Sequence, residues 1–114
     1  KNLGEGHTSV AIRRSNLAMI LKDMGELAEA RKLMEQALAS GIKNLGEGHT
    51  SVAIRRSNLA MILKKMGEYN KAKELLEKAY KTMERKLGAK HPNTLIVKRN
   101  LEGVVKAIEE SKKH

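Results

Sequence analysis

The sequence predicts an all-α protein, a short right-handed α-solenoid of antiparallel helix pairs in the order A-B-A-B-A. Two observations predict this fold. Residues 1–22 recur without change as residues 43–64, so the chain has a 42-residue period. Within each period, apolar residues return every three or four positions, which is the spacing of one helix face. We expect a single domain, residues 1–114, made of repeat one (1–42), repeat two (43–84) and a partial third repeat with a capping helix (85–114).

The first helix of each full repeat has a clear start, face and end. Apolar residues follow one another at steps of seven, four and three from Val10 to Met24. Thr8 and Ser9 precede this stretch and are candidate N-caps, because their hydroxyls can accept from the first free backbone N–H groups. Gly25 follows it and suits the left-handed backbone that ends many helices. The identical residues 43–64 predict the same helix A in repeat two.

The second helix of the pair carries its apolar stripe from Leu27 to Leu38. Glu26 and Glu29 lie in its first turn, where the helix dipole favours acidic side chains. We expect Gly41 to end it. The partial third repeat predicts one long A-type helix, over about residues 94–113, with no second helix after it.

Composition narrows the possible functions. The chain has a net charge of +10, no cysteine and only two aromatic residues, Tyr69 and Tyr80. Disulfides and thiolate metal sites are therefore excluded, and base-stacking surfaces are disfavoured. No early apolar run is typical of a signal peptide, and we expect a cytoplasmic location. Because the chain begins with Lys1 rather than Met, we expect a fragment or an engineered array.

The histidines are candidate metal or catalytic residues that the repeat argues against. His7, His49 and His91 recur one per repeat, which spaces them along the array instead of gathering them. We expect each imidazole to tie its loop to helix A. Asp23 is the single aspartate, and no grouping of histidine, acid and nucleophile exists. The sequence therefore predicts no enzyme activity, no metal and no cofactor.

The identity of the repeat follows from its small residues, because a 42-residue helical hairpin fits tetratricopeptide and HEAT repeats equally by length. Helix A has a large–small pair, the turn has a glycine, and helix B has further small residues. In repeat one these are Leu17, Ala18, Gly25, Ala30 and Ala37. The loop between repeats has the pattern Leu-Gly-x-x-His-(Pro)-x-Thr. The chain resembles the tetratricopeptide repeats of the 42-residue subclass, as in kinesin light chains and many bacterial signalling proteins.

Some positions depart from that pattern. Arg14, Arg56 and Lys98 fill a helix-A position that is normally large and apolar, and we expect them to pair with a helix-B glutamate such as Glu35 or Glu77. Thr8 and Thr50 replace the usual proline. Glu102 replaces the small residue of helix A, which is understandable if no helix B packs against it.

The resemblance implies that the A helices line a concave groove that binds a peptide. Much of the excess positive charge is expected there, with Lys22, Lys64 and Lys106 at equivalent positions. Asn16, Asn58 and Asn100 match an asparagine that often contacts peptide backbone in relatives, although packing between helices is an equally good interpretation. The predicted peptide-binding residues are Ser15, Asn16, Met19, Lys22, Ser57, Asn58, Met61, Lys64, Lys65, Arg99, Asn100 and Lys106.

The sequence is compatible with three functions. The first is a non-catalytic scaffold that binds an extended or helical, acidic peptide in a basic groove. The second is a structural repeat that associates only with itself, since the first helix A has the same apolar face as the second but no helix B before it. The third is nucleic-acid binding, which the net charge allows and the lack of aromatics and motifs weakens. No membrane association is expected.

Overall fold

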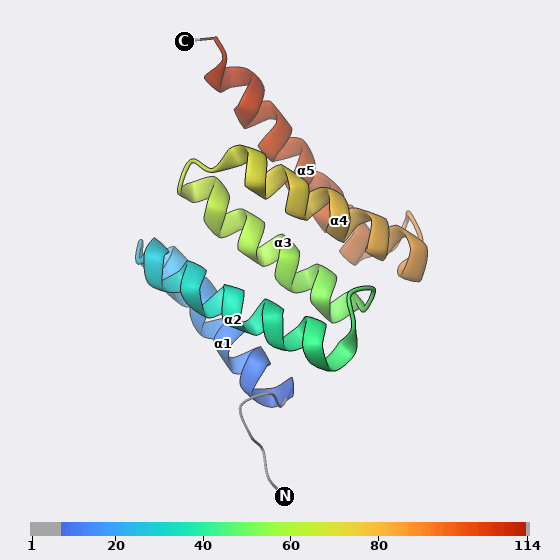
Figure 1. Ribbon diagram of the computed structural model, residues 1–114. Coiled ribbons are helices and arrows are strands. Elements are labelled where there is room, and N and C mark those ends of the chain that lie inside the picture. The colour runs from blue at the N-terminus through green and yellow to red at the C-terminus, as the bar shows by residue number, and fades with distance from the viewer. Residues whose placement is uncertain (1–7, 114) are drawn as a thin grey trace, which may run out of the picture.

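The computed structural model describes residues 8–113, which form a single array of helices with no strand among them (Figure 1). The helices are α1 (Thr8–Asp23), α2 (Leu27–Leu45), α3 (Thr50–Lys65), α4 (Tyr69–Leu87) and α5 (Pro92–Ser111). The all-α prediction and the A-B-A-B-A order are confirmed, with α1, α3 and α5 as the A helices and α2 and α4 as the B helices.

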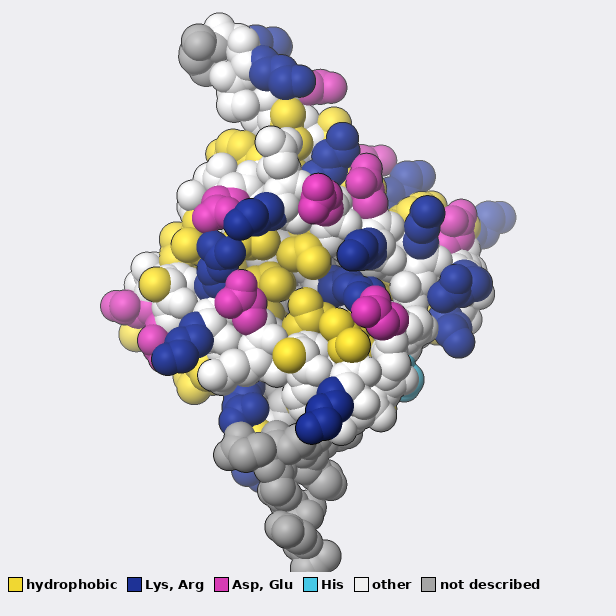
Figure 2. All heavy atoms as spheres, in the orientation of Figure 1, with side chains coloured by type: hydrophobic (Ala, Val, Ile, Leu, Met, Phe, Trp, Pro, Cys, Tyr) yellow, Lys and Arg dark blue, Asp and Glu magenta, His cyan; other side chains and the backbone are white. Residues whose placement is uncertain are grey.

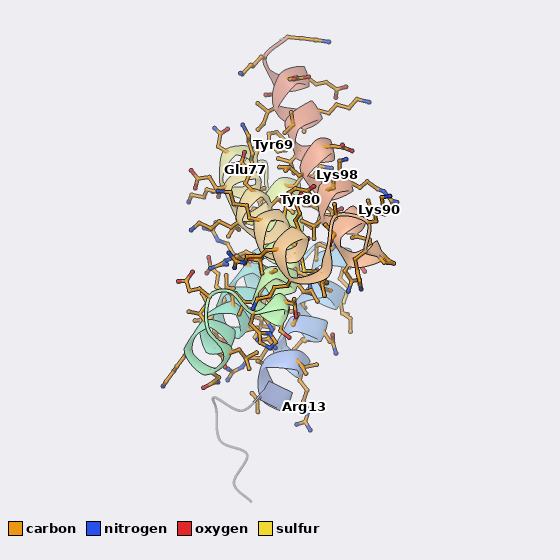
Figure 3. All side chains as sticks on the ribbon, turned by 90° about the vertical axis from the view of Figure 1, so that its right-hand side faces the viewer. Arg13, Tyr69, Glu77, Tyr80, Lys90 and Lys98 are labelled. Carbon is orange, nitrogen blue, oxygen red and sulfur yellow. The ribbon has the colours of Figure 1, made fainter. Side chains whose placement is uncertain are left out.

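The helices are arranged in two layers. Each helix packs against the next one in the chain, and the A helices also contact one another, α1 with α3 and α3 with α5. Within the described chain, the backbones of α2 and α4 do not approach each other in this way. The A helices are therefore the closely spaced layer, and a solenoid curves towards such a layer. Figure 3 shows α2 and α4 on one side of the array and α1 and α5 on the other.

Small residues allow the two layers to approach. Ala18 and Ala60 in the A helices, and Ala30 and Ala72 in the B helices, have no exposed surface. Larger side chains such as Met34, Ile62 and Leu76 fill the space around them and are also completely buried. The alternation of large and small residues that indicated the repeat therefore allows the antiparallel helices to pack closely.

Glycines with positive φ make the turns. Gly25 and Gly67, between the helices of each pair, have φ values of 87° and 85°, which confirms the predicted left-handed backbone. The prediction that Gly41 ends α2 is wrong, because α2 continues to Leu45 and Gly41 is buried inside it. The helix ends instead at Gly46, whose φ of 92° and ψ of 156° suit only glycine.

Histidine, not threonine, is the N-cap of the later A helices. His49 is the N-cap of α3, and its Nδ1 accepts a hydrogen bond of 3.0 Å from the Ser51 backbone N–H. His91 caps α5 in the same way through the Asn93 N–H, also at 3.0 Å. The predicted structural role is confirmed for these two histidines, while His7 and the side chains of Thr8 and Ser9 lie outside the described residues.

The pairing with a helix-B glutamate that was predicted for Arg56 and Lys98 is wrong. Arg56 pairs with Glu47 in the preceding loop, at 2.7 Å from Nη2 to Oε1, and not with a helix-B glutamate. Glu35 instead pairs with Arg31 on its own helix, at 3.0 Å. Lys98 is exposed and has no ion pair with any described residue. The helix-A position was expected to face helix B, whereas the loop before α3 is closer to Arg56.

The departure at Glu102 has the predicted packing explanation. Its counterparts Ala18 and Ala60 are buried under a helix B, whereas Glu102 is exposed. Among the described residues, no helix B follows α5 to cover this position. A carboxylate can therefore stay in water there at no desolvation cost.

The positive charge is less confined to the A helices than the sequence suggested. Because α4 extends to Leu87, it holds six basic and three acidic side chains, a net charge of +3, while α5 carries three of each sign. Figure 2 shows blue and magenta side chains interspersed over the face formed by α2 and α4. The outer face is thus of mixed sign, and any electrostatic selectivity has to come from local arrangement.

Candidate functional site

The three A helices place equivalent side chains next to one another on the inner layer. Ile12, Ile54 and Ile96 occupy one such position, separated by 42 residues each, and all three are exposed. A large aliphatic side chain is normally buried, so three of them in a row form an unusual exposed feature. We refer to Ile12, Ile54 and Ile96 as the isoleucine ladder.

Two hollows lie along this ladder, one in each gap between neighbouring A helices. Pocket I, between α1 and α3, has a volume of about 210 Å³, and pocket II, between α3 and α5, about 160 Å³. Ile54 and Asn58 line both, so the pockets adjoin. Pocket I is also lined by Ile12, Ser15, Asn16 and Arg55, and pocket II by Ser57, Ile96, Val97 and Asn100.

Five of the predicted peptide-binding residues line these pockets. They are Ser15, Asn16, Ser57, Asn58 and Asn100. Met19 and Met61 lie one helical turn further along α1 and α3, and both are half-buried. At the corresponding place in α5 the chain has Gly103. In α1 and α3, the isoleucine, asparagine and methionine side chains therefore form one continuous strip along the helix. In α5 the strip lacks its last side chain, because glycine replaces methionine.

The predicted lysines lie beyond that strip, towards the ends of the A helices. Lys22 is half-buried and pairs with Asp23 at 3.5 Å. Lys64 extends towards α5, since a Cβ added at Gly103 would lie 3.4 Å from its Nζ. Lys65, Arg99 and Lys106 are exposed. None of these five cations lines pocket I or pocket II.

One of the three asparagines has a packing role. Asn100 Nδ2 donates to the Ser57 hydroxyl at 3.2 Å and so links α5 to α3. The structure gives Asn16 and Asn58 no such bond, and Asn16 is exposed. The packing interpretation therefore applies to Asn100, whereas the side chains of Asn16 and Asn58 are available to a ligand.

Arg55 is one of the pocket residues that sequence reasoning missed. It lines pocket I and is nevertheless only 4% exposed. Its guanidinium lies against Gly41 of α2, and Nη1 donates to the Ala37 carbonyl at 3.4 Å. Burial lowers the pKa of Arg55. A signal existed in the sequence, because Gly41 and Arg55 correspond to Met83 and Val97 one repeat later, two substitutions that compensate each other in size.

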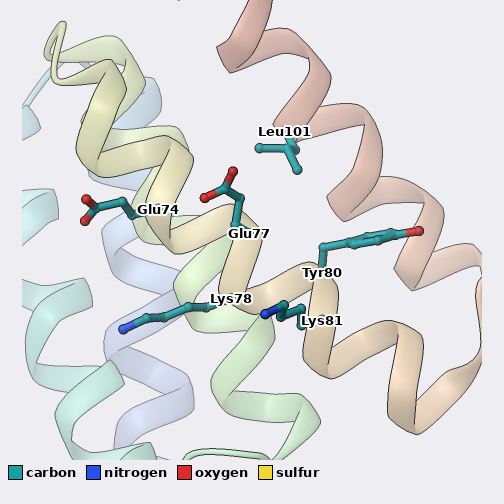
Figure 4. A pocket seen from close by; sticks show the side chains of 6 residues that line it. All are labelled: Glu74, Glu77, Lys78, Tyr80, Lys81 and Leu101. Atoms are coloured by element: carbon teal, nitrogen blue, oxygen red, sulfur yellow. The ribbon is translucent and has the colours of Figure 1, made fainter.

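Hollows larger than pockets I and II lie outside the A-helix layer. One, of about 540 Å³, lies between α4 and α5 and is lined by Glu74, Glu77, Lys78, Tyr80, Lys81 and Leu101 (Figure 4). Another, of about 300 Å³, is lined by Leu59, Leu63 and Leu75 between α2, α3 and α4, where Figure 2 shows a cluster of yellow side chains. Both are bordered by long side chains of opposite charge, and neither contains a predicted site residue.

No group of three or more histidine or acidic side chains among residues 8–113 is placed to hold a metal ion. None of the five described helices is long and apolar enough to cross a membrane. Pockets I and II are lined by amides, hydroxyls, aliphatic groups and the guanidinium of Arg55, a mixture that can position a ligand.

The fold and its two-layer arrangement define an α-solenoid repeat protein. The sequence pattern of the tetratricopeptide repeat matches residues 9–85 and again residues 54–113. The chain belongs to the tetratricopeptide repeat family, whose members typically act as non-catalytic scaffolds in protein–protein interactions. No curated protein sequence matches the chain.

Solved structures of similar proteins agree with this assignment. A putative kinesin light chain from Podosopora anserina, with nearly identical TPR-like repeats, has 27% identity and a TM-score of 0.83 over 93% of this chain. A point variant of that kinesin light chain has 27% identity and a TM-score of 0.80 over 99% of this chain. BtubC (BKLC) from P. vanneervenii has 26% identity and a TM-score of 0.79 over 86% of this chain. The chain spans 50%, 53% and 39% of those three structures, respectively.

Proposed function

We propose that this chain is a non-catalytic binding module whose inner layer of A helices holds an extended or helical, acidic segment of another protein. The observation that carries the proposal is the isoleucine ladder with its two adjoining pockets. Apolar side chains of the ligand contact the ladder, and Asn16 and Asn58 hydrogen-bond its backbone. The module works without metal or cofactor, and its place of action is the cytoplasm.

We propose that four cations beside the groove give the ligand its preferred charge. Lys64 and Lys65 are adjacent at the end of α3, and Lys106 and Arg99 lie on α5. Charges of one sign at the edge of a site steer an oppositely charged partner and raise its association rate. An acidic segment would therefore associate fast at low ionic strength, and salt would slow it.

The proposal is tested by reversing charge in two places. Lys64→Glu with Lys65→Glu changes the groove, and Lys78→Glu with Lys81→Glu makes the same change in net charge on α4. With an acidic peptide library as the probe, the first pair should lower the association rate about tenfold or more, and the second much less. Equal effects from both pairs, or binding that follows only an RNA probe, would contradict peptide binding in the groove.

A second candidate function is self-association, which one comparison within the chain favours. Leu17 and Ile20 of α1 are 47% and 55% exposed, whereas Leu59 and Ile62 at the same places in α3 are 5% and 0% exposed. The sequences of the two helices are identical over these residues, so their own side chains do not explain the difference in exposure. In α3 this face is covered because α2 packs against it, whereas no described helix comes before α1 to cover the same face. We propose that a second copy covers this face of α1, weakly, and more strongly as salt screens the net charge.

Sedimentation at several protein and salt concentrations tests self-association. We expect a shift to larger species with concentration and salt, and its loss in a variant with Leu17→Gln and Ile20→Gln. Ile12→Gln, in the groove, is the control that should leave the association unchanged. A strict monomer at high concentration and high salt would rule the second function out.

A further inference from the structure

Pockets I and II have the same construction but differ in one pair of residues. The pair is Gly41 and Arg55 beside pocket I, and Met83 and Val97 beside pocket II, one full repeat later in each case. The glycine or methionine comes from the helix B that underlies the gap, and the arginine or valine from the helix A that borders it. The two pockets therefore differ in charge while sharing their framework.

The two substitutions depend on each other. The Arg55 guanidinium occupies the space that a Cβ at Gly41 would need, so a side chain at position 41 excludes the arginine. In the next repeat Met83 fills that space and is 1% exposed, and the short Val97 fits beside it. Gly41 is thus retained inside a helix, where glycine is unfavourable, because it accommodates a buried cation.

The charge of Arg55 lacks a counter-ion. Among the described residues no carboxylate forms an ion pair with it, and Ala37 accepts the single hydrogen bond that it donates. A guanidinium has five N–H donors. None of its nitrogen atoms is both buried and without a partner, so the donors that Ala37 leaves free keep some contact with solvent. A nearly buried cation with free donors at the wall of a pocket attracts an anion.

We propose that pocket I accepts a carboxylate side chain of the bound segment and pocket II accepts an apolar one. This deepens the peptide-binding function proposed above and depends on it. Charge complementarity assigns the acid to pocket I, because Arg55 lines that pocket and Val97 takes its place in pocket II. The ligand is therefore a segment with one acidic and one apolar anchoring side chain. Because the two pockets take different side chains, the segment binds in one direction along the array.

The spacing of the anchors follows from the repeat. Pockets I and II lie in consecutive gaps between A helices, and packed helices are about 8–10 Å apart. A polyproline II segment has three residues per turn and rises 3.1 Å per residue, so residues i and i+3 project from one side about 9 Å apart. The segment therefore carries its acidic and apolar side chains three residues apart.

The inference is tested with four fluorescein-labelled peptides in Gly-Ser flanks, with the cores Glu-Ala-Ala-Leu, Leu-Ala-Ala-Glu, Gln-Ala-Ala-Leu and Glu-Ala-Ala-Glu. Wild-type protein should bind one of the first two about tenfold more tightly than the glutamine peptide, as expected for a hydrogen bond to a charged group. The double variant Gly41→Met with Arg55→Val copies the pair at Met83 and Val97, and it should lose this preference for glutamate.

The reciprocal variant, Met83→Gly with Val97→Arg, makes pocket II cationic and should bind the Glu-Ala-Ala-Glu core most tightly. It decides the question if the first variant fails to fold, which circular dichroism would reveal. Equal binding of glutamate and glutamine cores by wild-type protein, or an unchanged preference in both variants, overturns the inference and leaves the groove proposal standing. Failure of wild-type protein to bind any of the four peptides, or the acidic library, overturns both.

Discussion

Glu47 and Arg56 form an ion pair of 2.7 Å that connects the loop before α3 to the body of the helix. The Arg56 side chain is only 6% exposed, and its Nη1 also donates to the Glu47 carbonyl at 3.3 Å. One cation thus bonds to both the side chain and the backbone of one loop residue. This explains how a position that is usually apolar in the family tolerates a charge, since the stem is buried and the head is bonded.

Arg56→Met should destabilise the protein by about 1–3 kcal/mol, because it removes a charge-assisted bond and the backbone bond together. Glu47→Gln should cost less than about 1 kcal/mol, because the Glu47 side chain is exposed and the backbone bond to Arg56 remains. Urea denaturation of the two variants measures both values. An equal loss in the two would show that the ion pair alone matters.

His49→Ala should cost about 1 kcal/mol of stability, the usual value of an N-cap. The imidazole Nδ1 accepts from the Ser51 N–H, and alanine leaves that donor without a protein partner. His49→Asn is the matched control, because its side-chain oxygen can accept the same bond. If asparagine is as harmful as alanine in thermal unfolding, the histidine stabilises the loop in some other way.

Gly67→Ala should destabilise the protein by about 1 kcal/mol, because a left-handed backbone is unfavourable for any residue with a Cβ. No atom outside its chain neighbours lies within 4 Å of the new Cβ, so the cost is conformational and not a clash. Gly103→Ala, inside α5, should instead stabilise by about 0.5–1 kcal/mol, as alanine does in a helix interior. Opposite shifts in melting temperature are expected, and a neutral Gly67→Ala contradicts the account of the turn.

Glu68 should make the stability depend on pH. Its hydrogen bond to Lys71, and next its interactions with Arg31, lower the pKa of this carboxyl in the folded protein. A lowered carboxyl pKa adds stability above the unfolded pKa of about 4.3, and this is lost as pH falls through the folded pKa. Unfolding of wild-type and Glu68→Gln proteins from pH 7 to pH 3 should show a gap that closes in acid. A gap that does not change with pH would contradict this.

The fold could be predicted from the sequence because the repeat supplies the same evidence several times. Ala18 and Ala60, or Gly25 and Gly67, each support one structural role at two places. The helix ends were less predictable. Gly41 is a residue type that often ends a helix, but here it lies inside α2 and leaves space for the side chain of Arg55 from the next helix. A contact between residues of neighbouring repeats is invisible to a pattern within one helix.

The candidate site was predictable only along the A helices. Asn16 and Asn58 could be placed on one face by helical spacing, and both line the pockets. Helical spacing does not indicate Arg55, because its role depends on the space above a glycine in another helix, and only the comparison between repeats points to it. The partner of Arg56 was equally hidden, because the loop that supplies Glu47 has no periodicity.

The central claim is that ligands bind on the A-helix layer, and site-specific labelling tests it most directly. The chain has no cysteine, so Asn58→Cys places a single environment-sensitive fluorophore between pockets I and II, and Lys78→Cys places one on the outer face of α4. Titration with an acidic peptide library should change the emission at position 58 with saturation, and leave position 78 unchanged. A saturable change at position 78 with none at position 58 would contradict the account.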